Sequence, residues 1–69
     1  MIDLNMDIYE LGLTKRSLYA LNKNGIRSIK ELVTLNHYEL FHKKGIGDNI
    51  IADIMFCLKK QGLHLGMRI

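Results

Sequence analysis

The chain of 69 residues has no proline and a single cysteine. One cysteine excludes an internal disulfide, and the position of Cys57 inside an apolar run predicts a buried thiol. No apolar run approaches the roughly 20 residues that span a bilayer, and the N-terminus lacks the basic and apolar regions of a signal peptide. These absences predict one small globular domain in a reducing, cytoplasmic compartment.

Acidic residues are few beyond the first thirteen positions. Residues 1–13 carry three acids and no base, whereas residues 14–69 carry ten Lys or Arg against four acids. The overall charge of +3 is therefore the sum of an acidic segment, residues 1–13, and a distinctly basic segment, residues 14–69. A basic folded part favours an anionic partner.

The residue patterns of catalytic and metal sites are also missing. The three histidines are scattered without ligand spacing, and there is no second cysteine to complete a metal site. Asp48 and Asp53 are too far apart on a helix to act as a catalytic pair. We therefore expect neither enzymatic activity nor a metal or cofactor.

Without proline, glycines and capping residues divide residues 14–62 into helices. Thr14 is suited to cap the first helix, and the strings "SIKE" and "NHYE" match the capping box, with Ser28 and Asn36 as caps. The longest apolar-periodic run precedes Gly62. Four helices are expected, over residues 15–24, 29–35, from 37 onward and over 48–61.

The apolar positions of these helices predict an all-α bundle. Residues 1–13 are expected to lie extended against it and residues 63–69 to form a packed strap, because strands bounded by turns are absent. The similar strings "LNKNGIRSIKEL" and "FHKKGIGDNIIADI" predict two helix-hairpin-helix-like units within this single domain, 1–69. The side chains expected in the core are Ile8, Leu11, Leu13, Leu18, Leu21, Leu32, Val33, Leu40, Phe41, Ile50, Ile51, Ile54, Met55 and Leu58.

The turn Gly45-Ile46-Gly47 admits two interpretations. Glycine can reach the positive φ of a tight corner, with Ile46 filling the core beneath it. The same turn can point the first amides of the next helix at a phosphate, which the preceding Lys44 favours. Asp48 argues against phosphate, because its carboxylate is suited to satisfy those amides itself.

Cations open the first helix, where they oppose the helix dipole. Lys15 and Arg16 lie in its first turn, and Arg16, Tyr19 and Lys23 share one face at three- and four-residue spacing. This stripe is suited to a nucleic-acid backbone or groove. A solvated face of an amphipathic helix is the other interpretation.

Two long strings resemble the C-terminal domain of the bacterial RNA polymerase alpha subunit: "LGLTKRSLYALNKNGIRSIKELVTL" and "KGIGDNIIADIMFCLKKQGLHLGMRI". The resemblance covers about residues 8–69, and its most specific parts are "LT-x-RS" at 13–17 and "GL-x-LGMR" at 62–68. It implies a compact four-helix fold that binds the minor groove of A/T-rich DNA upstream of promoters. It also implies contacts with sigma factor and transcription activators.

The resemblance assigns roles to individual positions. Arg16 stands at the position of the groove-inserting arginine, Gly47 at the glycine of the last turn, and Asp53 at an acidic position of the family pattern. Three contact positions depart from the pattern. Tyr19 stands in place of an asparagine, and Asn49 and Ile50 in place of a lysine and a serine. Asp48 falls where a basic residue is common.

The leading hypothesis is a DNA-binding, transcription-associated domain with weak binding to the minor groove or the backbone. Its candidate DNA-binding residues are Lys15, Arg16, Tyr19, Lys44, Gly45, Gly47 and Asn49. The candidate partners are A/T-rich DNA, RNA polymerase subunits, sigma factor and transcription activators. The alternative is a protein-interaction module that has kept the fold and lost DNA binding, with an exposed apolar patch around Tyr19 and Ile50.

Overall fold

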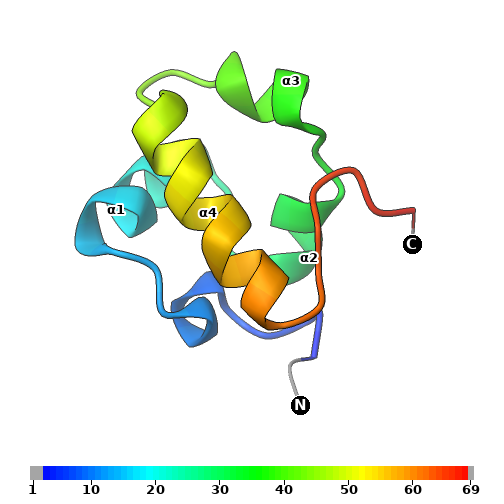
Figure 1. Ribbon diagram of the computed structural model, residues 1–69. Coiled ribbons are helices and arrows are strands. Elements are labelled where there is room, and N and C mark those ends of the chain that lie inside the picture. Colours follow the sequence, from blue (N-terminus) through cyan, green and yellow to red (C-terminus); the bar gives the residue numbers. More distant parts are fainter. Residues whose placement is uncertain (1–2, 69) are drawn as a thin grey trace.

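Five short helices pack around one apolar core in the computed structural model, which describes residues 3–68 (Figure 1). They are η1 (Ile8–Leu11), α1 (Lys15–Lys23), α2 (Ile29–Val33), α3 (His37–Phe41) and α4 (Asp48–Lys60). Within residues 3–68 no strand forms, and an isolated bridge joins Asp7 to Ser28. The predicted all-α fold with four α-helices is confirmed.

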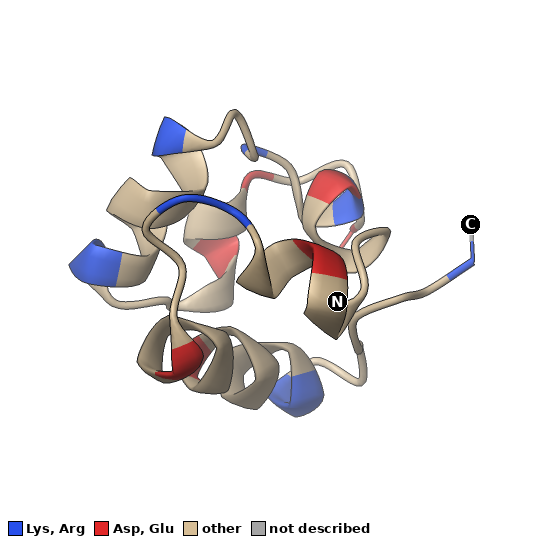
Figure 2. Cartoon of the chain, turned by 90° about the horizontal axis from the view of Figure 1, so that it is seen from above, with Lys and Arg blue, Asp and Glu red and all other residues tan. Residues whose placement is uncertain are grey.

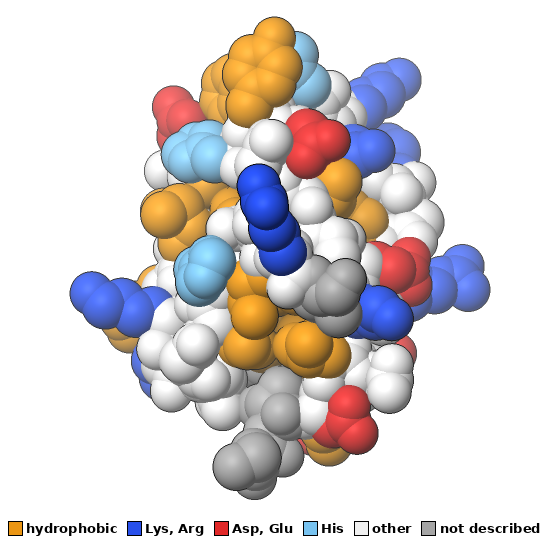
Figure 3. Space-filling view, turned by 90° about the vertical axis from the view of Figure 1, so that its right-hand side faces the viewer, with side chains coloured by type: hydrophobic (Ala, Val, Ile, Leu, Met, Phe, Trp, Pro, Cys, Tyr) orange, Lys and Arg blue, Asp and Glu red, His pale blue; other side chains and the backbone are white. Residues whose placement is uncertain are grey.

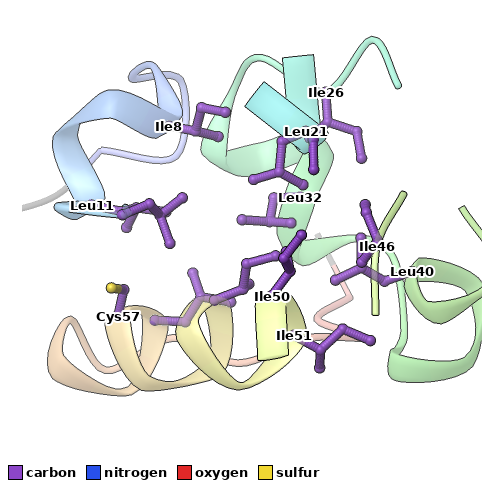
Figure 4. Packing of buried hydrophobic residues seen from close by; sticks show 14 of the residues in the cluster. Ile8, Leu11, Leu21, Ile26, Leu32, Leu40, Ile46, Ile50, Ile51 and Cys57 are labelled. Carbon is purple, nitrogen blue, oxygen red and sulfur yellow. The ribbon is translucent and has the colours of Figure 1, made fainter. Parts of the chain in front are cut away.

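The longest helix, α4, is the central element of the fold. Figure 1 shows it crossing the front of the molecule, with α1 on one flank and α2, α3 and the C-terminal segment on the other. Its buried side chains meet those of η1, α1, α2 and α3 in a single cluster (Figure 4). Each fully buried Leu or Ile contributes about 1.5–3 kcal/mol relative to an exposed one. The side chains that α4 buries are Ile50, Ile51, Ile54, Cys57 and Leu58.

The N-terminal segment differs from the prediction of an extended conformation for residues 1–13. Residues 8–11 form a 3₁₀ helix, because the Asp7 carboxylate accepts a hydrogen bond from the Tyr9 amide and so caps its first turn. The predicted apolar anchors Ile8, Leu11 and Leu13 are nevertheless buried. The prediction for residues 1 and 2 lies outside the described part of the chain.

Two side chains predicted to be buried are exposed. Phe41 is 45% exposed, because α3 is little more than one turn long and only Leu40 points into the core. Met55 is 46% exposed, because the buried stripe of α4 runs through Ile54 and Leu58 and leaves Met55 at its edge. Apolar spacing predicts the correct helices, but the apolar faces that it predicts for α3 and α4 are wider than those the structure shows.

The capping residues begin the helices where the sequence predicts. Thr14 and Ser28 accept hydrogen bonds from the amides three residues later, and Asn36 and Glu39 form a reciprocal capping box. The capping box predicted at Ser28 is incomplete, because the Glu31 carboxylate accepts from the Ser28 hydroxyl. The C-terminal strap is also as predicted, except that residue 69 is not described. Its Gly66 and Met67 amides donate to the carbonyls of Leu35 and Val33, each at 2.8 Å.

The turn between α3 and α4 is a tight corner. Gly45 has φ +82°, in the left-handed region, whereas Gly47 has φ −111° and is the N-cap of α4. Ile46, between them, is buried in the core as predicted. Only the first glycine is therefore demanded by the backbone conformation.

We predict that Gly45→Ala lowers the free energy of unfolding by about 1 kcal/mol, because a side chain is strained at positive φ. Urea unfolding followed by circular dichroism measures the change. Gly47→Ser is the control, since a Cβ there meets no atom within 4 Å and serine is a good N-cap. Equal losses in the two variants would contradict this account of the turn.

Candidate nucleic-acid interface

The start of α1 is held against α4 by one carboxylate. Asp53 Oδ2 accepts hydrogen bonds from the Thr14 amide at 3.2 Å, the Thr14 hydroxyl at 3.1 Å and the Ser17 hydroxyl at 2.7 Å. Ser17 is itself buried, with 1% of its surface exposed. The first turn of α1, with its two cations, is therefore fixed in position on the middle of α4.

The hydrogen bonds to Asp53 also shift its titration. Partial burial raises the pKa of the Asp53 carboxyl, but hydrogen bonds from the Ser17 hydroxyl and from the amide and hydroxyl of Thr14 outweigh burial and lower this pKa below its ordinary value. The neighbouring Cys57 thiol responds in the opposite way. Burial first, and then the negative charge of Asp53, raise the pKa of Cys57, so the thiol stays protonated at neutral pH.

The predicted contact residues of α1 are all exposed. Lys15 and Arg16 project from its first turn, and Tyr19 follows with 70% of its surface exposed. The Lys23 ammonium lies 6.0 Å from the centre of the Tyr19 ring, at the outer limit of a cation–π contact. The predicted stripe of Arg16, Tyr19 and Lys23 thus forms one basic and aromatic surface.

The turn before α4 is hydrogen-bonded to the C-terminal end of α1. The Asn24 side-chain amide donates to the Ala20 carbonyl at 2.8 Å and to the Lys44 carbonyl at 2.9 Å. Lys44, Gly45 and Gly47 are exposed, as expected of a contact surface.

Asn49 joins this surface from α4. It is exposed and lies one turn before Asp53, on the side of α4 that faces α1. The structure therefore brings together the two groups of candidate residues, those of α1 and those of the turn and α4.

Two expectations about this surface are wrong. Ile50 is buried, with only 8% of its surface exposed, so it cannot form an exposed apolar patch with Tyr19. The Asp48 carboxylate, expected to satisfy the free amides of α4, is exposed and makes no hydrogen bond within the described residues. The N-cap Gly47 has no side chain to do so either. No side chain therefore caps the amides at the start of α4.

Sequence reasoning missed the two side chains that position the candidate site, Asp53 and Asn24. Asp53 stands at an acidic position of the family pattern, but its partner Thr14 is 39 residues away in sequence. Asn24 is the last residue of the helix predicted over residues 15–24, and nothing in the sequence marks it as a contact. Only the packed arrangement shows that its amide reaches Lys44.

Residues 3–68 support neither a metal site nor a membrane-spanning helix. No three His, Cys, Asp or Glu side chains gather there as a metal site would require. None of the helices in that range has the length and hydropathy to cross a membrane.

Residues 1–60 match the model of a protein family, the C-terminal domain of the alpha chain of bacterial RNA polymerase. The sequence belongs to this family. It is 41% identical over 66 residues to the DNA-directed RNA polymerase alpha subunit of Aquifex aeolicus, covering 96% of this chain and 21% of that subunit. The alpha subunit of Thermus aquaticus is 38% identical over 63 residues, covering 91% and 20%.

The fold agrees with the family. The solution structure of the C-terminal domain of the RNA polymerase alpha subunit from Helicobacter pylori superposes with a TM-score of 0.83 at 31% identity, over 93% of this chain and 56% of that one. The family resemblance and the transcription-associated class predicted from the sequence are confirmed. The chain spans about a fifth of the length of the curated subunits that it matches, and the family model that it matches is that of a C-terminal domain.

We predict that Asp53→Asn lowers the free energy of unfolding by about 1–2 kcal/mol at neutral pH, because the charge-assisted hydrogen bonds to Thr14 and Ser17 weaken. Since the pKa of Asp53 is lowered by folding, its stabilisation is complete above the ordinary carboxyl pKa. It is lost as the pH falls through the pKa of the folded state. The difference between native and variant proteins should therefore shrink in acid.

Denaturant unfolding across an acidic-to-neutral pH series measures this difference. Asp48→Asn is the matched control, since it removes an exposed carboxylate of the same helix. A difference that is independent of pH, or one equal to that of Asp48→Asn, would refute the role of Asp53.

Proposed function

We propose that the chain is a DNA-binding domain of transcription, in which Arg16 enters the minor groove of A/T-rich DNA. The observation that carries the proposal is the exposed Arg16 on a helix start that Asp53 holds rigid through Thr14 and Ser17. Because the backbone beneath Arg16 is fixed before binding, little ordering entropy is lost when the guanidinium is bound. A narrow A/T-rich minor groove concentrates negative potential and favours an inserted arginine.

Backbone contacts would come from the residues around Arg16. Lys15 and Lys44 supply cations for phosphates on either side of the groove. The amides at the start of α4 have no side-chain cap, and Gly47 has no side chain to obstruct them, so they are suited to hydrogen-bond a phosphate oxygen. Asn49 is a neutral donor, and Asp48 beside it repels phosphate. These favourable contacts, reduced by the repulsion from Asp48, give a surface that binds DNA weakly.

The protein context follows from the family. We infer that the chain acts alongside RNA polymerase subunits, since its relatives are DNA-directed RNA polymerase alpha subunits. Sigma factor and transcription activators are the protein partners that the resemblance implies. The alternative of an interaction module without DNA binding is not favoured, because the apolar patch that it required is lost with the burial of Ile50.

We predict that Arg16→Ala weakens binding to an A/T-rich duplex about tenfold or more, since a specific groove contact is worth about 1–3 kcal/mol. Fluorescence anisotropy over a salt series measures the affinity, and the slope of log K against log salt should fall by about 0.9. A G/C-rich duplex shows whether the loss is specific to the groove.

The control for Arg16→Ala is Arg68→Ala. Arg68 is an exposed arginine of the C-terminal strap, which packs on α2, so the variant makes the same change in charge away from α1. Equal losses in the two variants would remove Arg16 from the site.

We predict that Asn49→Lys strengthens DNA binding several-fold and steepens the salt slope by about 0.9, because it adds one phosphate contact. Asn49 is exposed, so the substitution leaves the core intact. Glu31→Lys offers the comparison, because it adds a lysine on α2, outside the proposed surface. Since Glu31→Lys changes the net charge by +2 and Asn49→Lys by +1, net charge alone would make Glu31→Lys the stronger binder, and that result would remove Asn49 from the site.

A further inference from the structure

A hollow of about 230 Å³ opens between η1 and α1. It is lined by Tyr9 of η1 and by Lys15, Leu18, Tyr19 and Asn22 of α1. The four residues of α1 follow one another at spacings of three, one and three, so they share one face of that helix. We call this space the tyrosine hollow.

The two tyrosines of the hollow have rings that are free to stack on a ligand. Tyr9 is 60% exposed and Tyr19 is 70% exposed. Within residues 3–68 no other aromatic ring packs on either of them. Tyr38 of α3 differs, because its ring centre lies 4.2 Å from that of His42. The hollow therefore offers two open aromatic surfaces to a planar group.

The backbone beneath both tyrosines is fixed. The Tyr9 amide donates to the Asp7 carboxylate at 3.0 Å, and the neighbouring Ile8 is completely buried. Tyr19 lies in the middle of α1, next to Leu18, which packs against the core. Because this backbone is ordered before any ligand binds, little conformational entropy is lost on binding.

Asn22 adds a group that can recognise the edge of a base. Its side-chain amide donates to the Tyr9 hydroxyl at 3.4 Å, which is a long hydrogen bond, and makes no other within residues 3–68. An amide can donate and accept at once, and asparagine pairs with adenine in this way. Two aromatic rings, the apolar Leu18 and one amide together match a nucleobase, which is apolar on its faces and polar at its edge.

The charges around the hollow differ between its two sides. Lys15 and Lys23 lie in the first and last turns of α1, which has no acidic residue, and Figure 2 shows both ends of this helix in blue on the left of the molecule. They are about 12 Å apart along the helix. Asp7 and Glu10 lie on the η1 side. Phosphates are therefore attracted along α1 and repelled from η1, which favours a strand of nucleic acid over a free nucleotide.

The size of the hollow selects a single base. A closed cavity of about 150 Å³ takes up benzene, so a hollow of about 230 Å³ that opens to solvent has room for one nucleobase. A paired base cannot enter, because its partner covers its edge and its neighbours in the stack cover its faces. The fitting ligand is therefore an unpaired base.

We propose that the tyrosine hollow binds one unpaired base of a single-stranded nucleic acid, stacked on Tyr9 and Tyr19, while Lys15 and Lys23 attract the phosphates of the strand. The hollow shares Lys15 and Tyr19 with the proposed DNA surface, and so extends that surface from paired to unpaired strands. Binding at the hollow does not require Arg16 to enter a groove, so the two proposals can fail independently.

Tyrosine fluorescence tests the proposal directly. The chain has three tyrosines and no tryptophan, and two of the three line the hollow. A single-stranded, adenine-rich oligonucleotide quenches about half of the emission or more, after correction for absorption by the DNA, because a stacked base quenches both rings. The same strand paired into a duplex quenches far less. Adenosine monophosphate binds about tenfold more weakly than the oligonucleotide, because it has a single phosphate.

Substitution of Tyr9 separates stacking from charge. Tyr9→Leu weakens binding of the single strand about tenfold, whereas Tyr9→Phe keeps the ring and stays within about twofold of native. Tyr38→Leu is the matched control, since Tyr38 is 71% exposed and belongs to α3. Figure 3 shows that side of the molecule, away from α1, where hydrophobic side chains gather with histidines beside them. Circular dichroism verifies that the variants keep the native helix content.

The affinity for a duplex distinguishes this proposal from that of the groove. Tyr9→Leu leaves the affinity for an A/T-rich duplex within about twofold of native, because Tyr9 is not among the proposed groove and backbone contacts. Loss of single-strand binding in Tyr9→Leu, together with unchanged duplex binding in Arg16→Ala, would support the tyrosine hollow and refute the groove contact.

Four results would overturn the proposal. They are emission that does not change at millimolar oligonucleotide, equal losses of single-strand binding in Tyr9→Leu and Tyr38→Leu, equal quenching by the single strand and the duplex, and a mononucleotide that binds as tightly as the oligonucleotide.

Discussion

The Asp53 carboxylate is the contact on which the arrangement of the candidate site depends. It accepts hydrogen bonds from the amide and hydroxyl of Thr14 and from the hydroxyl of Ser17, and so joins the start of α1 to the middle of α4. Two cations in the first turn of α1 oppose its dipole, and the negative charge of Asp53 at that same end offsets them. One side chain from another helix thus makes a locally unfavourable basic helix start stable.

The two helix starts of the candidate site are stabilised in different ways. That of α1 is closed, with Thr14 and Asp53 satisfying its polar groups. The start of α4 has no side-chain cap, because its N-cap is Gly47 and Asp48 supplies a negative charge but no hydrogen bond. The helix α4 is stable without a side-chain cap, because it buries five side chains in the core. The rigidly held Arg16 backbone beside the uncapped start of α4 is an arrangement suited to bind a polyanion.

Local chemistry explains which parts of the structure could be predicted from the sequence. The caps Thr14, Ser28 and Asn36 and the turn at Gly45 are encoded within a few residues, and each was predicted correctly. Residue spacing does not show where an apolar face ends, so it predicts Met55 and Phe41 in the core although both are exposed. The contacts that position the site join residues 20 and 39 apart in sequence, which no local pattern reveals.

The surface beside α1 occupies one side of α4 because of helix geometry. Asn49 and Asp53 lie one turn apart on the side that faces α1, so Asp53 can hold the start of α1 while Asn49 stays exposed. A substitution at Asn49 therefore changes the charge of this surface without weakening the contact that positions Arg16. The contacts that this surface can make with DNA are ionic in part, so added salt would weaken DNA binding.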